Sequence, residues 1–416
     1  MTDIQKIFLR LVRLGIGCAN ENDNVNDNLD PVFWSGVDWE AVLALAERQG
    51  LSAVVADGIE CLPKEARPPK PVMLQLIGSV LQNYEYRHEL YRRAIAELAG
   101  FYNSHGFKMM VLKGFACALD WPKPEHRPSG DIDIWQFGQQ KEADEVLANM
   151  DFTNYTDKGS REGSKSIKYL PKNRIEIDNS HHHHTVFYWG DFMVENHYDF
   201  INVHARRSNA RLEKIFKELG DASHILETCG TSDQARASEN DNRGMKIPSV
   251  DVYGERVYLP SANLHGLFLI RHAVAHFAAA EITLRQVLDW AFFMEKHGNE
   301  VDWSWLTDVL AEFGLRRFFD VLNAICVEDL GFGFKSLGVY GLQLAFVDKE
   351  LKERVLGDIL EPEFSDEPPK RRLPRMLFRY RRWQANGWKQ RLCYNESRCS
   401  AFWSGVWNHL LKPSSI

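Results

Sequence analysis

The sequence lacks paired cysteines, long hydrophobic runs and a strong net charge. Its seven cysteines are widely spaced and form no CxxC pair, which is typical of a reducing compartment and argues against a disulfide framework. Nowhere do about 18 apolar residues follow one another, the length that a membrane-spanning helix needs. We therefore expect a cytoplasmic protein without a membrane partner.

The charge balance also bears on whether the protein binds nucleic acid. A net charge of −7 on 416 residues gives no support to a protein that coats nucleic acid, although it leaves room for a local basic patch. Residues 370–391 hold nine Lys or Arg, no acid and four interleaved aromatic rings. Such a segment suits contact with nucleic acid, but we favour an amphipathic helix that docks on the body of the protein and is neutralised by the acidic stretch 358–367. Nucleic acid stays open as a partner without being indicated.

The chain is longer than a domain with a single hydrophobic core usually is. The spacing of its apolar residues and its composition divide it into four segments. Residues 1–105 and 258–416 show the apolar spacing of helices. Residues 106–205 alternate strand and helix patterns, and 206–257 are polar and loop-rich, with 230–244 as the clearest loop. We predict an α+β fold in which a small mixed sheet is flanked by N-terminal and C-terminal helical regions.

The sheet segment begins with a strand pattern at 107–114, which leads through a glycine into a short helix. A strand, "DIDIW", and a helix at 139–150 follow. The later strand candidates are 166–170, 174–178, 185–189 and 192–200.

Two aspartates one residue apart stand out in "DIDIW". Alternation along a strand sends Ile132 and Ile134 to one face and Asp131 and Asp133 to the other. Two carboxylates side by side repel each other and lose hydration, so either a cation lies between them or the pair is exposed at a sheet edge. The flanking isoleucines favour the first interpretation, and Mg²⁺, a hard cation that prefers oxygen ligands, suits such a pair.

A third acid would complete a site for two metal ions that brace an in-line phosphoryl displacement. The strand at 192–200 places Glu195 on one face with His197, while Asp178 in "RIEID" is the rival. We prefer Glu195, and we expect His197 to support the metal ligands or to contact the nucleotide.

Lys113 and Gly114 stand between a predicted strand and a predicted helix, where a glycine lets a phosphate approach the backbone amides. Arg127, in a proline-bounded loop, has the guanidinium to meet a phosphate at two points. Each signal is weak alone, because strand–glycine–helix junctions are common and a lone arginine is more often a surface ion-pair partner.

Together, "LKG", Arg127, "DIDIW" and "VENH" resemble the nucleotidyltransferase superfamily of DNA polymerase beta type. The similarity is to a poorly characterised bacterial branch with Lys-Gly, Arg, Asp-Ile-Asp and Glu-x-His motifs, and it covers about residues 40–310. The resemblance implies that Asp131, Asp133 and Glu195 are the catalytic, metal-binding carboxylates.

The same resemblance implies that Lys113 and Gly114 mark a phosphate-binding turn and that Arg127 lies near the phosphates. Two departures leave nucleotide specificity and turnover open. The Gly-Ser pair of other members is absent, and Asn196 stands between the acid and the histidine.

We therefore expect a transferase that uses Mg²⁺ or Mn²⁺ to move a nucleoside monophosphate from an NTP to an unidentified acceptor, with release of pyrophosphate. One alternative is a catalytically inactive nucleotide-binding or protein-interaction module on the same fold. Another is a histidine-rich metal hydrolase. The acceptor, the preferred NTP and the oligomeric state are not readable from the sequence.

Four consecutive histidines, His181–His184, precede the strand at 185–189. If they lie on a strand, they alternate between faces, so at most one alternating pair joins a metal ligand from elsewhere. Such a pair is His182 with His184 or His181 with His183. We favour solvated or hydrogen-bonded residues of a hairpin.

Overall fold

The computed structural model describes residues 1–17, 34, 36–150, 175–225, 245–333, 347–364 and 371–397. These residues form two compact units, each built from separate stretches of the chain. Unit 1 takes its described residues from Met1–His88, Cys117–Pro128 and Gly266–Arg398, and unit 2 from Glu89–Ala116 and Ser129–His265. The N-terminal and C-terminal helical segments thus contribute to the same unit, which cuts across the four expected segments.

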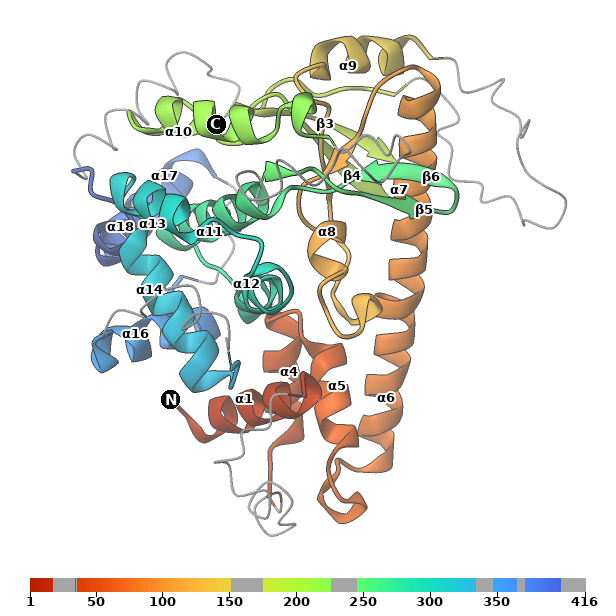
Figure 1. The fold of residues 1–416 in the computed structure, drawn as a ribbon. Coiled ribbons are helices and arrows are strands. Elements are labelled where there is room, and N and C mark those ends of the chain that lie inside the picture. The colour runs from red at the N-terminus through yellow and green to blue at the C-terminus, as the bar shows by residue number, and fades with distance from the viewer. Residues whose placement is uncertain are drawn as a thin grey trace, which may run out of the picture. The chain divides into compact units, whose positions relative to one another are not determined.

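The α+β prediction is confirmed. Unit 2 contains a sheet, of which Figure 1 labels β3, β4, β5 and β6. Its described strands run in the order β3-β4-β2-β1-β6-β5. Their bounds are β1 Met110–Val111, β2 Ile132–Trp135, β3 His184–Trp189, β4 Phe192–His197, β5 Ser249–Val252 and β6 Glu255–Tyr258. The sheet is mixed, because β2 pairs with β4 and β1 with β6 in parallel, while the other neighbouring strands are antiparallel.

The helices of unit 2 bury apolar side chains. They are α7 (Arg87–Ser104, whose first two residues belong to unit 1), the first residues of α8 (Phe115–Ala118), α9 (Gln140–Asn149) and α10 (Asn209–Leu219). The predicted helix at 139–150 is confirmed as α9, which buries Ala143 and Leu147. Polar contacts between α9 and both β3 and β4 are described with the site below.

The hairpin of β5 and β6 was not predicted, because it lies in the segment expected to be loop-rich. Its strands are short and half polar, and a two-residue turn with positive φ at Tyr253 and Gly254 joins them. Such turns match the twist of a hairpin. The parallel pairing of Met110 with Tyr258, which attaches the hairpin to the sheet, joins residues that are distant in sequence. The clearest predicted loop, 230–244, and the strand candidate 166–170 lie outside the described residues.

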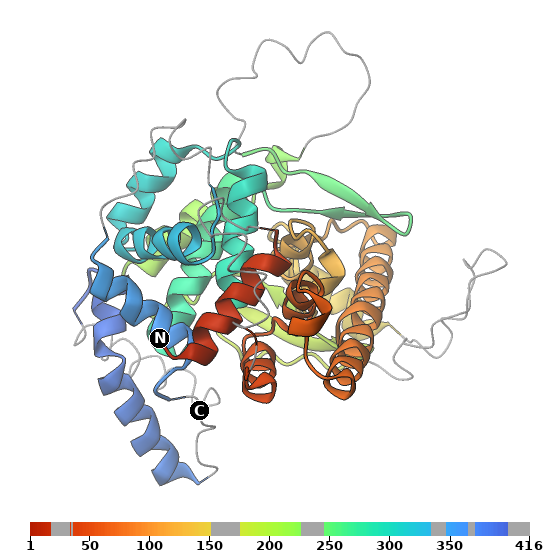
Figure 2. The same ribbon diagram turned by 90° about the horizontal axis from the view of Figure 1, so that it is seen from below.

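Unit 1 is helical in its described residues. Its longer helices are α1 Asp3–Gly15, α4 Trp39–Arg48, α5 Ser52–Glu60, α6 Lys70–Val80, α11 Ala262–Ala279 (from Gly266 on), α12 Leu284–His297, α13 Trp303–Glu312, α14 Arg316–Ala324, α16 Lys349–Leu360, α17 Arg372–Ala385 and α18 Gly387–Cys393. Helix α1 packs on α4 and α5 (Figures 1 and 2). A Cβ at Gly15 would lie 2.0 Å from the carbonyl oxygen of Val54, so the small residue permits backbone contact between α1 and α5.

The basic segment forms α17 and α18, and α18 docks on the body as expected, with Trp388 packed on Phe277 of α11. On α17, Met376, Leu377 and Tyr380 are exposed by 66%, 51% and 48%. The expected neutralisation occurs on α18, where the Nζ atom of buried Lys389 lies 2.5 Å from a carboxylate oxygen of Asp358. Among the described residues, no cysteine forms a disulfide and no helix is long and apolar enough to cross a membrane.

Candidate active site

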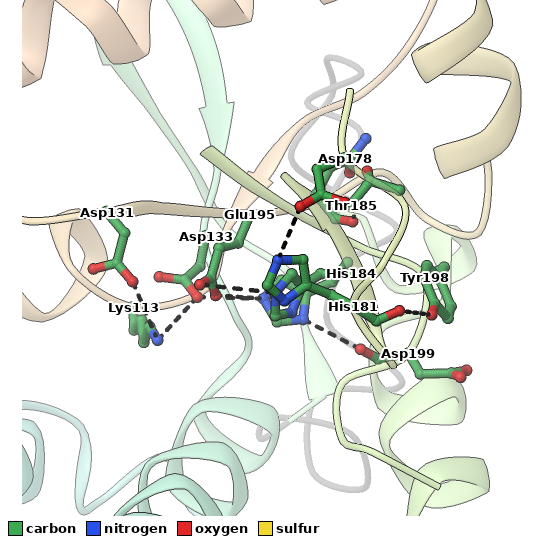
Figure 3. A network of polar contacts seen from close by, with 12 residues as sticks. Lys113, Asp131, Asp133, Asp178, His181, His184, Thr185, Glu195, Tyr198 and Asp199 are labelled. Atoms are coloured by element: carbon green, nitrogen blue, oxygen red, sulfur yellow. Dashed lines mark hydrogen bonds and ion pairs between the residues drawn. The ribbon is translucent and has the colours of Figure 1, made fainter. Parts of the chain in front are cut away.

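Strands β2 and β4 bring two of the predicted acids together. The strands are parallel neighbours, and their register pairs Asp133 with Glu195. Since paired residues on adjacent strands point to the same face, the two carboxylates lie side by side (Figure 3). The side chain of Asp133 is fully buried, whereas that of Glu195 is 17% exposed. Asp131, one residue before β2, is 38% exposed.

The cation between the two aspartates is Lys113. Its Nζ atom lies 2.9 Å from Oδ1 of Asp133 and 3.9 Å from Oδ2 of Asp131 (Figure 3). Burial alone would lower the pKa of Lys113, but the charges of Asp133, Asp131 and Glu195 outweigh burial and raise it. Burial alone would likewise raise the pKa of Asp133, whereas Lys113 and His197 hold it below its usual range. Lys113 therefore stays charged and keeps Asp133 ionised.

His197 completes the carboxylate group. Its Nδ1 atom lies 3.2 Å from the backbone carbonyl of Asp199. Because a carbonyl only accepts hydrogen bonds, Nδ1 carries a proton. The other ring nitrogen, Nε2, lies 3.2 Å from Oδ1 of Asp133 and 3.8 Å from Oε2 of Glu195. The backbone thus aims the ring so that Nε2 points at the two acids.

Asp133, Glu195 and His197 fit a divalent cation. Each offers one ligand atom, and these atoms all lie within 4.8 Å of one another. In addition, Oδ2 of Asp133 is buried and has no hydrogen-bond partner among the described residues. Two carboxylates with one imidazole suit Mg²⁺ or Mn²⁺. Asp131 belongs to neither of the potential ligand groups found among the described residues, so its role as a metal ligand stays a prediction.

Glu195 has an unusual acidity. Burial and the neighbouring charge of Asp133 raise the pKa of Glu195 to about 8, although Lys113 opposes the shift. Two carboxylates in register cannot both ionise easily, so Asp133 keeps the charge and Glu195 binds a proton more readily.

The turn after β1 depends on Gly114. Its φ is +64°, and a Cβ there would lie 2.5 Å from the hydroxyl oxygen of Tyr91. That hydroxyl donates a hydrogen bond of 2.8 Å to the backbone carbonyl of Asp131. The glycine therefore allows the turn and the start of β2 to be fixed by the same tyrosine on α7.

A polar network behind the acids was missed by the sequence reasoning. Asn196 points away from Glu195 and His197, and its amide donates to Oδ1 of Asp144 on α9 at 2.8 Å. The hydroxyl of Thr185 on β3 donates to Oδ2 of Asp144 at 2.7 Å. Asn196, noted above as a departure from the family pattern, thus anchors β4 to α9. A polar residue between two functional ones on a strand was the available signal, because it must face the opposite layer.

Arg127 is engaged within unit 1. Its Nε and Nη2 atoms donate to the two carboxylate oxygens of Asp289 at 2.7 and 2.9 Å, and the indole of Trp121 donates to the same carboxylate at 2.9 Å. All three residues are buried. The phosphate contact that the resemblance implies for Arg127 stays a prediction beside this structural role. The rival acid, Asp178, forms an isolated bridge with Val186 and lies 3.5 Å from His181.

The histidine run differs from its expected geometry. His183 precedes β3, which begins at His184, so strand alternation does not separate these neighbours. Instead, nitrogen atoms of His183, His184 and His197 lie within 4.8 Å of one another. Burial and the adjacent imidazoles lower the pKa of His183 to about 2 and that of His184 to about 3. The expectation that only alternating residues of the run share a site was therefore wrong.

Comparison with known proteins supplies the family. A family model described as "uncharacterised nucleotidyltransferase" matches residues 35–331, well over half of the chain. The chain belongs to this family. The segment matched to the uncharacterised nucleotidyltransferases includes Lys113, Asp133, Glu195 and His197. No curated protein and no solved structure matches the chain significantly.

Proposed function

We propose that the protein is a metal-dependent nucleotidyltransferase, which moves a nucleoside monophosphate from an NTP to an acceptor hydroxyl or phosphate and releases pyrophosphate. Its family membership supports transfer of a nucleotide. The observation that carries the proposal is the register of Asp133 with Glu195, with Nε2 of His197 aimed at both.

The charged residues around Asp133 each have a role in this proposal. Asp133 and Glu195 hold Mg²⁺ or Mn²⁺, which supplies charge neutralisation for the triphosphate and a lower pKa for the acceptor hydroxyl. Asp131 joins these ligands as the exposed member. Lys113, held 2.9 Å from Asp133, adds a positive charge beside the turn at Gly114, whose backbone amides meet the phosphates.

Glu195 is the group best suited to accept the proton of the acceptor. Burial and the charge of Asp133 raise its pKa, so its ionised carboxylate accepts a proton more strongly than an ordinary glutamate does. Its partial exposure leaves a path to an acceptor, whereas Asp133 is fully buried. No covalent intermediate is required, because positioning and charge stabilisation carry the reaction.

The test follows label from α-labelled NTPs into acceptors of a cell extract, in Mg²⁺ or Mn²⁺, with pyrophosphate release as the second readout. We expect Asp133→Asn and Glu195→Gln to lower transfer by at least about 100-fold. Asp191→Asn is the matched control, because Asp191 is an exposed acid in the turn between β3 and β4. Transfer that persists in both site variants contradicts the proposal.

The same experiment distinguishes the transferase from the alternative, a nucleotide-binding module without catalysis. A nucleotide-binding module without catalysis predicts that NTPs raise the melting temperature of the wild type while no label is transferred to any acceptor. The ion pair between Lys113 and Asp133 is compatible with such a module, since it balances the charge of the buried acid without a metal. Labelled acceptor that disappears in Asp133→Asn excludes this alternative.

A further inference from the structure

We propose that His183, His184 and His197 form a binding site for an imidazole-preferring transition-metal ion of the Zn²⁺ class. This site goes beyond the proposed nucleotidyl transfer, which needs only the carboxylate group. The first observation is that each of the three residues offers a ring nitrogen within 4.8 Å of the other two. Three nitrogens bound at about 2.0–2.1 Å to one ion lie within such a distance of each other.

The ring positions agree with convergence on one point. The ring centroids of His183 and His184 are 4.3 Å apart, and those of His183 and His184 lie 5.5 and 5.2 Å from that of His197. Rings this close together can each direct a nitrogen at a single bound ion.

Two of the three side chains also present nitrogens that the protein does not satisfy. The Nδ1 atoms of His183 and His184 are buried and have no hydrogen-bond partner among the described residues. His184 is 7% exposed overall. Leaving a buried polar atom without a partner is unfavourable, so an ion bound by these rings removes a cost that the unliganded rings carry.

The backbone holds the three histidines before any ion binds. His184 and His197 are register partners on the antiparallel strands β3 and β4. The carbonyl of His183 accepts hydrogen bonds from the amides of Tyr198 and Asp199, each 3.1 Å long. His197 is oriented by its Nδ1 bond to the carbonyl of Asp199. Ligands fixed in this way are typical of built metal sites, in which second contacts orient the rings.

The donor set distinguishes this site from the carboxylate group. Imidazole nitrogens suit Zn²⁺, Cu²⁺, Ni²⁺ and Co²⁺, whereas Mg²⁺ prefers oxygen ligands. Three protein ligands leave one position of a tetrahedral ion open. An oxygen of Glu195 lies 3.8 Å from Nε2 of His184, so the acids lie beside this site. Because His197 belongs to both groups, the two sites share a ligand.

The experiment measures the binding of Zn²⁺ and Co²⁺ alone to the full chain, without nucleotide. We expect the wild type to bind one equivalent of Zn²⁺ and to develop tetrahedral Co²⁺ absorption bands that Zn²⁺ abolishes. His183→Gln and His184→Gln are each expected to weaken Zn²⁺ binding by at least about tenfold. His181→Gln is the control from the same run, because His181 is exposed and does not belong to the group; its affinity should change by less than about threefold.

Further measurements keep the outcomes distinct. X-ray absorption at the zinc edge counts the imidazole ligands in the wild type directly, and we expect three. This measurement needs no variant, so it still tests the site if a variant fails to fold. Ligation by oxygen atoms alone, or variants that bind Zn²⁺ as tightly as His181→Gln, would overturn the site. Asp133→Asn should retain Zn²⁺ while losing nucleotidyl transfer, which separates the failure of this proposal from that of the proposed function.

Discussion

Asp133 of β2 and Glu195 of β4 are register partners on adjacent parallel strands. The pairing places the two carboxylates on the same face of the sheet. A slip of one residue in either strand would send one of them to the opposite face. Lys113 offsets the repulsion from the end of β1, with its ammonium 2.9 Å from Asp133. The site is therefore a property of the strand register as much as of the residues.

Removing the internal cation should make the site depend on added cations. We expect Lys113→Met to destabilise the protein in EDTA by about 3 kcal/mol, because a buried pair loses one partner. Mg²⁺ should then raise the melting temperature of the variant more than that of the wild type, since no ammonium competes for Asp133. Thermal unfolding in EDTA and in Mg²⁺ measures both effects.

Lys141→Met serves as the control, because Lys141 is exposed on α9. It should match the wild type in both conditions. Equal stability of Lys113→Met and Lys141→Met in EDTA would mean that the ammonium does not neutralise the acids.

The Asp144 network should matter for stability although it lies behind the site. Asp144 accepts hydrogen bonds from Gln140, Thr185 and Asn196. Asp144→Ala leaves these donors without their acceptor, which should cost about 2–4 kcal/mol. Asp191→Ala, an exposed acid in the β3–β4 turn, should cost less than about 0.5 kcal/mol. Urea unfolding compares the two, and similar midpoints would show that the network is not a structural anchor.

Arg127 and Asp289 should behave as a coupled pair. Their side chains are 7% and 6% exposed, so Arg127→Met is expected to cost about 3–5 kcal/mol by leaving a buried carboxylate unpaired. The double variant with Asp289→Leu should cost less than the sum of the single variants. Strict additivity in urea unfolding would exclude the coupling.

The same variant tests the phosphate contact that the resemblance implies for Arg127. Such a contact predicts that the KM for NTP rises in Arg127→Met, when activity is measured well below the unfolding transition. A KM equal to that of the wild type, together with lowered stability, would assign Arg127 to the structure of unit 1 alone.

The sequence could predict that Asp133 and Glu195 meet, because successive side chains of a strand point to opposite faces of the sheet. Alternation placed both aspartates opposite the isoleucines, and it placed Glu195 on one face with His197. The resemblance then selected Glu195 over Asp178. Lys113 answers the question of what lies between the aspartates, although the sequence assigned Lys113 to phosphate rather than to Asp133.

Features that depend on long-range pairing could not be read in the same way. The β5–β6 hairpin joins the sheet through Met110 and Tyr258, and neither local strand has a strong apolar pattern. The contact of Asp144 with Asn196 requires knowing which helix covers β4. His183 was misjudged because alternation was applied beyond the start of the strand. Period and spacing report local geometry, whereas these contacts depend on how distant segments meet.

A pH-dependent contribution to stability is expected from unit 1. Nδ1 of His126 lies 2.7 Å from a carboxylate oxygen of Asp57, and Lys123 and Glu85 face the same pair. Burial opposes the charged forms of both groups, but their hydrogen bond and mutual attraction raise the pKa of His126 and lower that of Asp57. The His126 contribution is therefore complete below its ordinary pKa of about 6.5 and is lost as pH rises through the raised value.

The measurement compares His126→Gln with the wild type. At about pH 5.5 the variant should be less stable by roughly 1.5 kcal/mol, the usual size of a charged hydrogen bond. The difference should shrink at about pH 9, where the imidazole is neutral in both the folded and unfolded states. Asp57 limits the stabilisation at low pH, because its contribution to folding stability is lost as pH falls through its lowered pKa. A difference that grows with pH would contradict the pairing.

Gly114 allows backbone strain to be separated from steric conflict. Gly114→Ala combines a φ of +64° with a Cβ 2.5 Å from the hydroxyl of Tyr91, and should cost about 1–2 kcal/mol for the φ and about 1–3 kcal/mol more for the contact. Gly138→Ala has a φ of +84° but nothing within 4 Å, so it should show only the first cost. Adding Tyr91→Phe should recover part of the loss in Gly114→Ala, because the conflicting oxygen is removed. If Gly114→Ala and Gly138→Ala are equally stable in urea, the tyrosine moves aside freely and does not fix the turn.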